Sequence, residues 1–336
     1  MGYSVEVVGR RKLLTCIAAA LISGAAVAAP LQAASFRLEQ ATDRVVVNLD
    51  GRPIATYVYR DKVVRRPYFA NLHAPDGTPV TRNWPPKAGE DPTDHADMHP
   101  GLWLAFGDIS GVDFWRNKGR VEHERFVEPP TARQAVANFT VLNRYVDPSS
   151  QQVLCHEEAL YSFRSSSAGV LLIWQSKFSS PREFYFGDQE EMGLGLRIAT
   201  PLTVTHGGQI LDTQGRRDER EIWGKKALWC DYSKQIGNKH VGVTLLTDPA
   251  NFAGCWMHVR DYGLLVANPF GRNAFTKEPP SKVSVGKSET LRLRFGILLH
   301  ATPAKDTYIR AAYKDFQRDL ASMDWDKSGW IEDRAQ

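Results

Sequence analysis

The sequence predicts an all-β protein, an antiparallel β-sandwich with a C-terminal helix. Short runs of β-branched and aromatic residues recur along the chain, and glycine, proline, asparagine and aspartate separate them. The spacing between these runs leaves no room for the helices that connect parallel strands. With 336 residues, 43% of them apolar, the chain is long enough for one large β domain or two ordinary ones.

The first 29 residues have the pattern of an export signal. Arg10, Arg11 and Lys12 precede a largely apolar run over 13–22, and small residues follow it. The paired arginines suit a twin-arginine address, and an ordinary secretory signal is an equal alternative. We therefore expect a periplasmic or secreted protein.

Charge and hydropathy limit the partners of the mature chain. Removing residues 1–29 lowers the formal net charge from +4 to +2, because that segment holds three basic residues and one acid. This near balance gives no electrostatic basis for a nucleic-acid partner. The best later apolar run, 168–174, is far shorter than the roughly 18 residues of a membrane span, so no span is expected.

The strands are expected in the following order. The first two form a hairpin over 44–59, where Asp50 and Gly51 separate β-branched runs and glycine accepts the positive φ of a tight turn. Another turn is expected at 74–80. Further strands are expected at 138–146, 152–164, 169–178, 194–204, 241–247, 255–270 and 289–300.

After residue 302 the pattern changes from strand to helix. Apolar residues at three- and four-residue steps predict one buried helical face. They are Ile309, Ala312, Tyr313, Phe316 and Leu320. The predicted organisation is thus a signal at 1–29, a β-sandwich domain at 30–302 and a helical tail at 303–336.

The mature chain holds three cysteines, Cys155, Cys230 and Cys255. An odd number cannot all pair within one chain. Three free thiols are one possibility, and a bridge between Cys230 and Cys255 is the other. No closely spaced cysteine pair indicates a structural zinc.

The segment 94–115, DHADMHPGLWLAFGDISGVDFW, holds the first candidate site residues. His95 and His99 would share one face of a helix, but Pro100 follows at once and favours a loop. The two histidines could transfer protons, or bind a divalent metal if a third ligand joined them. The candidates for that ligand are Asp94, Asp97, His206 and His258.

Aromatic and polar residues follow in the same segment. Alternation places Trp103 opposite Leu102 and Leu104, so one face of this strand is expected in the core. Indole rings such as Trp103 and Trp115 can also stack on a sugar ring. The nearby Asp108, Asp113 and Arg116 could then bind its hydroxyl groups.

A second cluster lies at 187–199. Glu190 and Glu191 would point to opposite sides of an extended strand, and Arg197 is a positive neighbour. Paired carboxyl groups can serve as acid and base when proximity separates their pKa values. A solvated acidic turn is the alternative interpretation.

A third cluster lies at 256–271, where a period of two places four aromatic or basic side chains on one face of a strand. They are Trp256, His258, Arg260 and Tyr262. Burying Arg and His requires partners, so this face is poor core material and indicates a binding surface. An ordinary exposed sheet face is the alternative.

Four segments, 66–85, 94–119, 187–202 and 256–271, resemble the bacterial PmoA-like family, a mostly exported group that carries a methane oxygenase label. The resemblance spans roughly residues 60 to 300. It implies a sandwich similar to the galactose-mutarotase-like supersandwich, a fold of carbohydrate epimerases, lyases and hydrolases. It supplies no catalytic residues.

Together these observations predict an exported carbohydrate-active enzyme that uses acid/base residues on a glycan or small sugar. The predicted catalytic residues are His95, His99, Glu191, His258 and Tyr262. The predicted substrate-binding residues are Trp103, Asp108, Asp113, Trp115, Arg116, Arg197, Arg260 and Asp261. A non-catalytic periplasmic sugar-binding protein is one alternative. A metal-dependent oxidase with His95 and His99 as ligands is the other; otherwise no cofactor is expected.

Overall fold

The computed structural model describes residues 1–4, 35–133, 135–166, 168–302 and 306–323. The expected export signal lies almost entirely outside these residues and stays a prediction. Contacts define one compact unit from Ala33 onward, and both sheets, the core and the candidate site belong to it.

The first layer of this unit is a nine-stranded antiparallel sheet. Its strands in spatial order are β1 (Phe36–Gln40), β2 (Arg44–Leu49), β3 (Arg52–Val58), β4 (Tyr68–Ala70), β5 (Leu102–Phe106), β11 (Met192–Arg197), β17 (Leu264–Asn268), β16 (Trp256–Arg260) and β13 (Lys225–Lys226). Strands β1 to β5 follow the chain, whereas β11, β17 and β16 come from distant segments. The sheet therefore brings the three candidate clusters into neighbouring strands.

The second layer is an eight-stranded antiparallel sheet. Its strands in spatial order are β12 (Gln209–Asp212), β14 (Trp229–Ile236), β15 (Lys239–Thr247), β19 (Leu291–Thr302), β9 (Gly169–Ser179), β8 (Val153–Ser166), β7 (Val136–Val146) and β6 (Arg120–Arg133). The smaller elements are the two-stranded ribbon β10 (Phe184–Phe186) with β18 (Val283–Val285), the short helices α1 (Asp218–Ile222) and α2 (Arg272–Thr276), and the 3-10 turns η1 (Thr200–Leu202) and η2 (Val204–His206).

Aromatic side chains from both layers fill the space between them. The ring of Tyr57 from the first layer lies 5.2 Å from Phe139 of the second, and Phe69 lies 5.1 Å from Tyr161. Burying a side chain of this size contributes about 1.5–3 kcal/mol through removal of apolar surface from water. The predicted all-β antiparallel sandwich is thus confirmed.

The hairpin predicted over 44–59 is present. Leu49 pairs with Arg52, which leaves Asp50 and Gly51 as the turn. Their φ angles are +50° and +77°, the left-handed values that a two-residue hairpin turn requires. Glycine at the second position removes the steric cost of that geometry.

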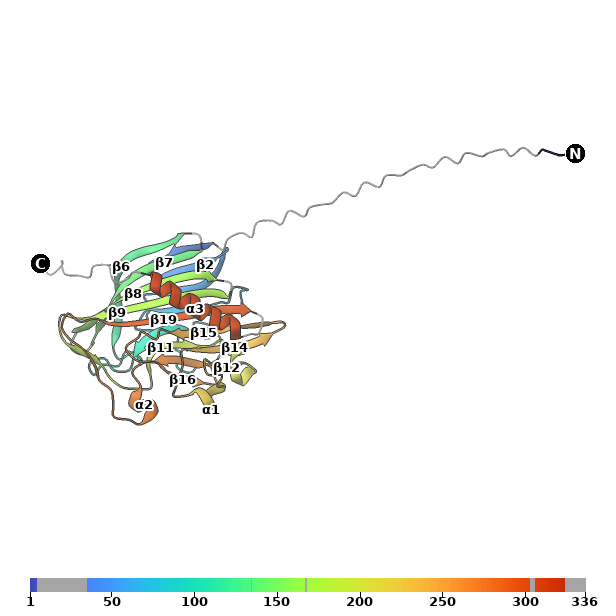
Figure 1. The fold of residues 1–336 in the computed structure, drawn as a ribbon. Coiled ribbons are helices and arrows are strands. Elements are labelled where there is room, and N and C mark those ends of the chain that lie inside the picture. The colour runs from blue at the N-terminus through green and yellow to red at the C-terminus, as the bar shows by residue number, and fades with distance from the viewer. Residues whose placement is uncertain (5–34, 134, 167, 303–305, 324–336) are drawn as a thin grey trace. The chain divides into compact units, whose positions relative to one another are not determined.

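The C-terminal helix α3 (Asp306–Ser322) lies across the outer face of the eight-stranded sheet (Figure 1). The residues predicted for its apolar face are all buried, and Phe316 packs with Leu171 and Trp229 of the sheet. The helix is confirmed, whereas the boundary at residue 302 stays a prediction because 303–305 are outside the described residues. No helix among the described residues is long and apolar enough to span a membrane.

The three cysteines among the described residues are free thiols. Cys155, Cys230 and Cys255 are all buried and unbridged, and burial raises the pKa of each. A raised pKa keeps a thiol protonated and unreactive near neutral pH. Of the two possibilities, the free-thiol interpretation is confirmed.

Candidate functional site

The strand register places the three candidate clusters on one face of the nine-stranded sheet. Trp103 pairs with Gly195 and Val266 pairs with His258, while Gly195 pairs with Val266 between them. Directly paired residues point to the same side of a sheet, so Trp103 and His258 share the outer face. Three strand spacings of about 4.8 Å put them roughly 14 Å apart. An extended ligand such as an oligosaccharide can span this distance.

Three side chains form the His99 stack, which consists of His99, Trp103 and Trp115. The imidazole of His99 lies parallel to the indole of Trp103, with ring centroids 4.8 Å apart and 10° between the planes. Trp115 Nε1–H donates a hydrogen bond to His99 Nε2 at 3.3 Å. Burial lowers the pKa of His99 to about 2, aided by the charge of Arg66. His99 is therefore neutral at pH 7 and fixes the indoles in place.

Both faces of β5 are buried, which corrects the expectation of a single core face. Leu104 faces the interior, and Trp103 on the outer face is 0% exposed. The difference arises because the turn at 94–99 brings the His99 ring onto the indole. Neither Trp103 nor Trp115 presents a free face to solvent, so the predicted stacking platform is covered by the protein itself.

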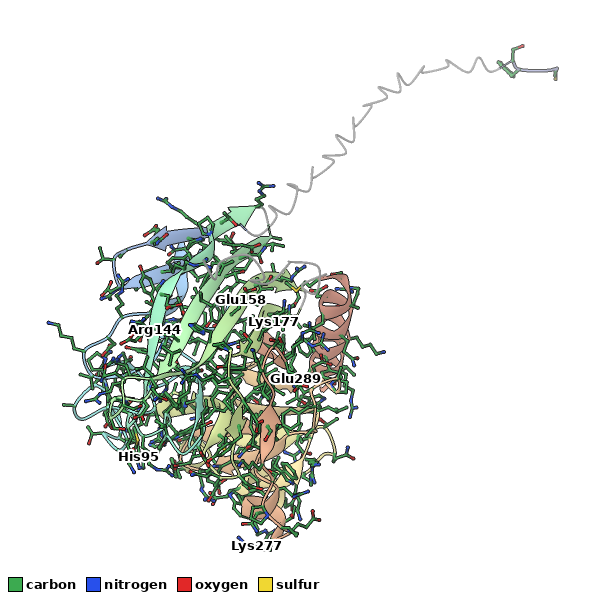
Figure 2. All side chains as sticks on the ribbon, turned by 90° about the vertical axis from the view of Figure 1, so that its left-hand side faces the viewer. His95, Arg144, Glu158, Lys177, Lys277 and Glu289 are labelled. Atoms are coloured by element: carbon green, nitrogen blue, oxygen red, sulfur yellow. The ribbon has the colours of Figure 1, made fainter. Side chains whose placement is uncertain are left out.

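The segment 94–99 is a turn, as expected from the proline that follows it. The amide groups of Met98 and His99 both donate to the His95 carbonyl oxygen, at 3.0 and 2.9 Å. His95 stays about half exposed, and its ring lies 5.0 Å from that of His99. Figure 2 shows His95 on the side of the sandwich away from α3.

A metal site at these histidines receives no support from the geometry. In the described part of the chain, no three His, Cys, Asp or Glu side chains come together as metal ligands would. His206 instead lies within 2.7 Å of Thr203 Oγ1, and His258 contacts Glu190. The pair His95 and His99 thus lacks the third ligand that a metal requires.

Three arginines are buried around the His99 stack, although guanidinium groups almost always lie at the surface. Arg66 donates to the carbonyl oxygens of Phe114 and Trp115, at 3.2 and 3.0 Å. Arg82 donates to the carbonyl oxygens of Asp94 and His99, at 2.9 and 3.0 Å. These bonds tie the 94–99 turn and the 114–115 segment to the sheet.

The third buried arginine is Arg197, at the end of β11. Its Nη2 lies 2.7 Å from a carboxylate oxygen of Asp94. The ring of Tyr262 covers the same guanidinium, with Cζ 4.6 Å from the ring centroid. Two of the predicted site residues, Arg197 and Tyr262, are thus in direct contact, and Asp94 forms an ion pair with Arg197.

Glu191 lies between the clusters at the start of β11. Burial raises the pKa of its carboxyl group, Arg116 lowers it in part, and the neighbouring Glu190 raises it further. An ion pair joins Glu191 to Arg116, and an electrostatic interaction links it to His95. About a quarter of the side chain is exposed, so a ligand can reach it.

Four side chains form what we call the Glu190 cluster. They are Glu190, Trp223, His258 and Arg260. Glu190 Oε1 lies 3.2 Å from His258 Nε2 and 2.9 Å from Arg260 Nη2. It also accepts a hydrogen bond from Trp223 Nε1 at 3.2 Å. Burial lowers the pKa of His258 to about 4, and Glu190 opposes part of that shift. His258 is thus neutral at pH 7.

Asp261 is engaged in a structural contact. Its carboxylate accepts the amide of Glu219 at 2.9 Å, and the Glu219 carboxylate accepts the Asp261 amide at 3.0 Å. This reciprocal pair anchors the first turn of α1 beside β16. A substrate would therefore have to compete with Glu219 for the carboxylate of Asp261, which was predicted to bind substrate.

Asp108, Asp113 and Arg116 line a hollow of about 860 Å³ beside β5. The two carboxylates also fix the local loop, because Asp108 accepts the amide of Gly111 at 2.7 Å and Asp113 accepts the amide of Arg116 at 2.9 Å. Arg116 connects this hollow to Glu191 through their ion pair. The predicted hydroxyl binders therefore lie next to the acid/base candidate.

Arg66, Arg82, Glu190 and Trp223 are site residues that the sequence analysis did not select. Arg66 and Arg82 fall within the segment 66–85, which resembles the PmoA-like family, but no periodicity marks an arginine in a loop as buried. The sequence analysis selected Glu191 of the Glu190 and Glu191 pair, and both residues lie in a bend just before β11.

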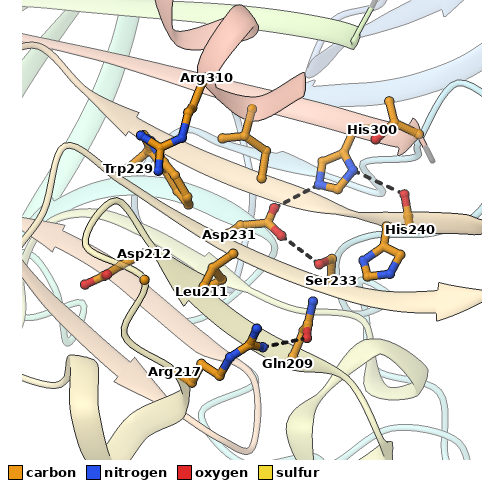
Figure 3. A pocket seen from close by; sticks show the side chains of 13 residues that line it. Gln209, Leu211, Asp212, Arg217, Trp229, Asp231, Ser233, His240, His300 and Arg310 are labelled. Carbon is orange, nitrogen blue, oxygen red and sulfur yellow. Dashed lines mark hydrogen bonds and ion pairs between the residues drawn. The ribbon is translucent and has the colours of Figure 1, made fainter. Parts of the chain in front are cut away.

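A second pocket, of about 490 Å³, lies on the eight-stranded sheet near the start of α3, and none of the predicted site residues lines it (Figure 3). Its floor holds a buried ion pair in which His300 Nε2 lies 2.8 Å from Asp231 Oδ1. Ser233 and Thr244 donate to the same carboxylate, at 2.6 and 2.7 Å. Both carboxylate oxygens of Asp231 are thus engaged, Oδ1 by His300 and Thr244 and Oδ2 by Ser233.

The Asp231→Asn variant is expected to lose about 1–3 kcal/mol of unfolding free energy at pH 7. Burial alone raises the pKa of Asp231, but His300, Ser233 and Thr244 together hold it below its usual value. A depressed carboxyl pKa stabilises the fold above about pH 4 and loses that effect as the pH falls through the folded-state value. Urea denaturation between pH 2 and 7 should show a flatter dependence in the variant. An unchanged pH dependence would contradict the ion pair.

Comparisons with solved structures return weak likenesses. One is to an α-galactosidase from Lactobacillus brevis, with 9% identity, a TM-score of 0.43, and 84% of this chain and 41% of that one covered. A variant α-galactosidase from Geobacillus stearothermophilus in complex with 1-deoxygalactonojirimycin gives 8% identity, a TM-score of 0.42, and coverage of 84% and 43%. A galactose mutarotase-like protein from Lactobacillus casei gives 7% identity and a TM-score of 0.37, with 79% of this chain and 100% of that one covered.

This chain thus spans about two fifths of the length of the two α-galactosidases. Because each TM-score is below 0.5, the fold class rests on the two sheets described above. No curated protein sequence matches the chain.

One family model matches, and its description is "Family of unknown function (DUF6807)". The match runs over residues 44–314, which includes all the candidate site residues and nearly all of both sheets. The resemblance to the PmoA-like family is not tested by this match and stays a prediction. The chain belongs to the DUF6807 family.

Proposed function

We propose that the protein is an exported carbohydrate-active enzyme that binds a glycan over the outer face of its nine-stranded sheet. The strand register is the observation that supports this most directly, because it places Trp103, Arg197, His258 and Arg260 on one face. Mixed aromatic and charged surfaces of this kind bind sugar rings and orient their hydroxyl groups. The basic and apolar N-terminal segment supports export.

Glu191 and His95 form the acid/base pair of this proposal. A raised pKa lets Glu191 hold its proton at a pH where an ordinary glutamate has lost it, which suits a general acid. His95 is half exposed and interacts electrostatically with Glu191, so it can take up a proton from substrate or water. The chemistry is cleavage or isomerisation at a sugar.

The remaining groups bind and orient the substrate. Tyr262 is 40% exposed and takes the stacking role that the covered indoles of the His99 stack cannot fill. Arg260 and His258 are held by Glu190, so their positions are fixed before a ligand arrives. Arg116 lies where it can contact both substrate and Glu191.

A non-catalytic sugar-binding protein is the second candidate, since aromatic and arginine contacts alone suffice for binding. The surroundings of Glu191 favour the enzyme, because this partly exposed carboxyl group lies next to Arg116, interacts with His95 and has a pKa that burial raises.

A glycan panel separates the two candidates. Purified protein is incubated with plant and bacterial polysaccharides and oligosaccharides, and products are followed by mass spectrometry and by new reducing ends. We expect products from one class of glycan and none with Glu191→Gln. The matched control is Glu39→Gln, because Glu39 is exposed on β1 at the far end of the sheet. Tight binding of a glycan without any product would favour the binding protein and contradict the enzyme.

A further inference from the structure

We propose that the glycan is acidic and that its carboxylate binds at Arg82 and Arg197, in the place that Asp94 occupies in this structure. This inference rests on the proposed function and names the substrate class of the same site. The uronic acids are the sugars whose ring carries such a carboxylate. The contacts, the hydrogen-bond balance and the exposure of the surrounding residues each support it.

The first observation is an excess of buried positive charge. Arg66, Arg82 and Arg197 are 3%, 1% and 1% exposed. The carboxylate of Asp94 is shared between two of them, 2.7 Å from Arg197 Nη2 and 3.6 Å from Arg82 Nη1. A buried cation needs an anionic partner, and here two guanidinium groups share a single carboxylate that is itself 40% exposed. Asp94 contacts both arginines through the same oxygen, Oδ1, whereas a ligand carboxylate could offer one oxygen to each guanidinium group.

The second observation is a surplus of hydrogen-bond donors. Five buried nitrogen atoms around the His99 stack have no hydrogen-bond partner. They are Arg66 Nε, Arg82 Nε, His99 Nδ1, Trp103 Nε1 and Arg197 Nη1. His99 belongs with the donors because its Nε2 accepts from Trp115, which leaves the proton on Nδ1. A carboxylate brings acceptors only, whereas a hydroxyl group brings a further donor. Two of these donors, Arg82 Nε and Arg197 Nη1, belong to the arginines of the proposed site and favour a carboxylate there.

The third observation is that Asp94 can be replaced from solvent. It belongs to the 94–99 turn, and its side chain and that of Tyr262 lie over Arg197. Tyr262 is 40% exposed, as Asp94 is, so both lie at the surface above the buried guanidinium. A carboxylate from a substrate can take the place of Asp94 and use both of its oxygens toward the two arginines. The adjacent His95 and Glu191 would then meet the same sugar unit.

Matched ligands test this directly. Oligosaccharides of galacturonic acid, their methyl esters and the corresponding galactose oligosaccharides differ chiefly in the carboxylate, and a glucuronic acid series repeats the comparison. Calorimetry should show binding of at least one free acid about 10- to 100-fold tighter than its methyl ester, the range of a charge-assisted hydrogen bond. Added NaCl should reduce this preference.

Two variants assign the preference to the proposed site. Arg197→Gln should remove the preference for the free acid, and the exposed Arg37→Gln on β1 should keep it. Asp94→Asn should tighten binding of the acid several-fold and leave the ester unchanged, because it removes the competing carboxylate. This second variant is at the surface, so its result stands even if Arg197→Gln fails to fold.

Equal affinity for acid and ester, or a preference that survives in Arg197→Gln, would overturn the inference. Neutral oligosaccharides that are bound and converted without any preference for acids would overturn it and leave the proposed function in place. If no sugar in any of the three forms binds or is converted, the proposed function fails and the inference fails with it.

Discussion

Replacing Glu191 with glutamine is expected to lower turnover of the glycan by about 10²- to 10⁴-fold, the usual contribution of a positioned acid or base. The variant keeps the size of the side chain and removes its proton transfer. Its fold should be intact, because Glu191 lies at the start of β11 and about a quarter of its side chain is exposed. Initial rates on the active glycan, with melting temperatures as the check on folding, measure the effect.

The same variant also makes a prediction about pH. Burial raises the pKa of Glu191, so its protonated form persists above the usual range and is lost as the pH rises through the shifted value. A general acid works only while protonated, so the wild-type rate should fall along that limb. The limb should be absent from the residual activity of Glu191→Gln. A variant with full activity, or with an unchanged pH profile, would show that another group supplies the proton.

The Trp103→Ala variant is expected to lose about 3–5 kcal/mol of unfolding free energy, the range for removing a large buried aromatic side chain. The indole is 0% exposed, lies against Gly195 and supports the His99 ring. Its removal leaves a cavity on the outer face of β5 and frees the 94–99 turn. Urea denaturation gives the change directly.

Trp223→Ala is the matched comparison for that measurement, because this indole is only partly buried and lies in the Glu190 cluster. We expect a smaller loss of stability from Trp223→Ala than from Trp103→Ala. A Trp103→Ala variant as stable as Trp223→Ala would mean that the His99 stack does not support the fold.

Local rules predicted much of this structure. A period of two placed Trp256, His258 and Arg260 on one face, and the register confirms it. The Asp50 and Gly51 turn followed from the need for positive φ. In these cases the sequence signal and the physical cause lie within a few residues of each other.

The features that the sequence analysis did not predict depend on contacts between distant segments of the chain. Alternation separated Trp103 from Leu104 but could not show that a turn covers the outer face as well. Arg82 and Arg66 gave no signal, because the carbonyl oxygens that hold them come from loops 10 to 49 residues away. The partners of Glu190 and Glu191 also come from distant segments, at 223–260 for Glu190 and at 116 for Glu191. Such features follow from the tertiary fold and from no local pattern.

The site has two groups of fixed polar side chains on one sheet face, the His99 stack with its arginines and the Glu190 cluster. They are separated by Gly195 and Val266, which are small or apolar and leave the connecting strip of sheet without competing charge. Glu191 and Arg116 lie beside this strip. A ligand bound along it would meet the acid/base pair and both groups at once.

The most direct test is a crystal structure of the Glu191→Gln variant with an oligosaccharide that the wild-type protein converts or binds. We predict that the sugar lies on the outer face of the nine-stranded sheet, between Tyr262 and His95 on one side and His258 with Arg260 on the other. A sugar found in the pocket lined by Trp229 and His300 on the eight-stranded sheet, with the outer face of the nine-stranded sheet empty, would contradict the proposed site.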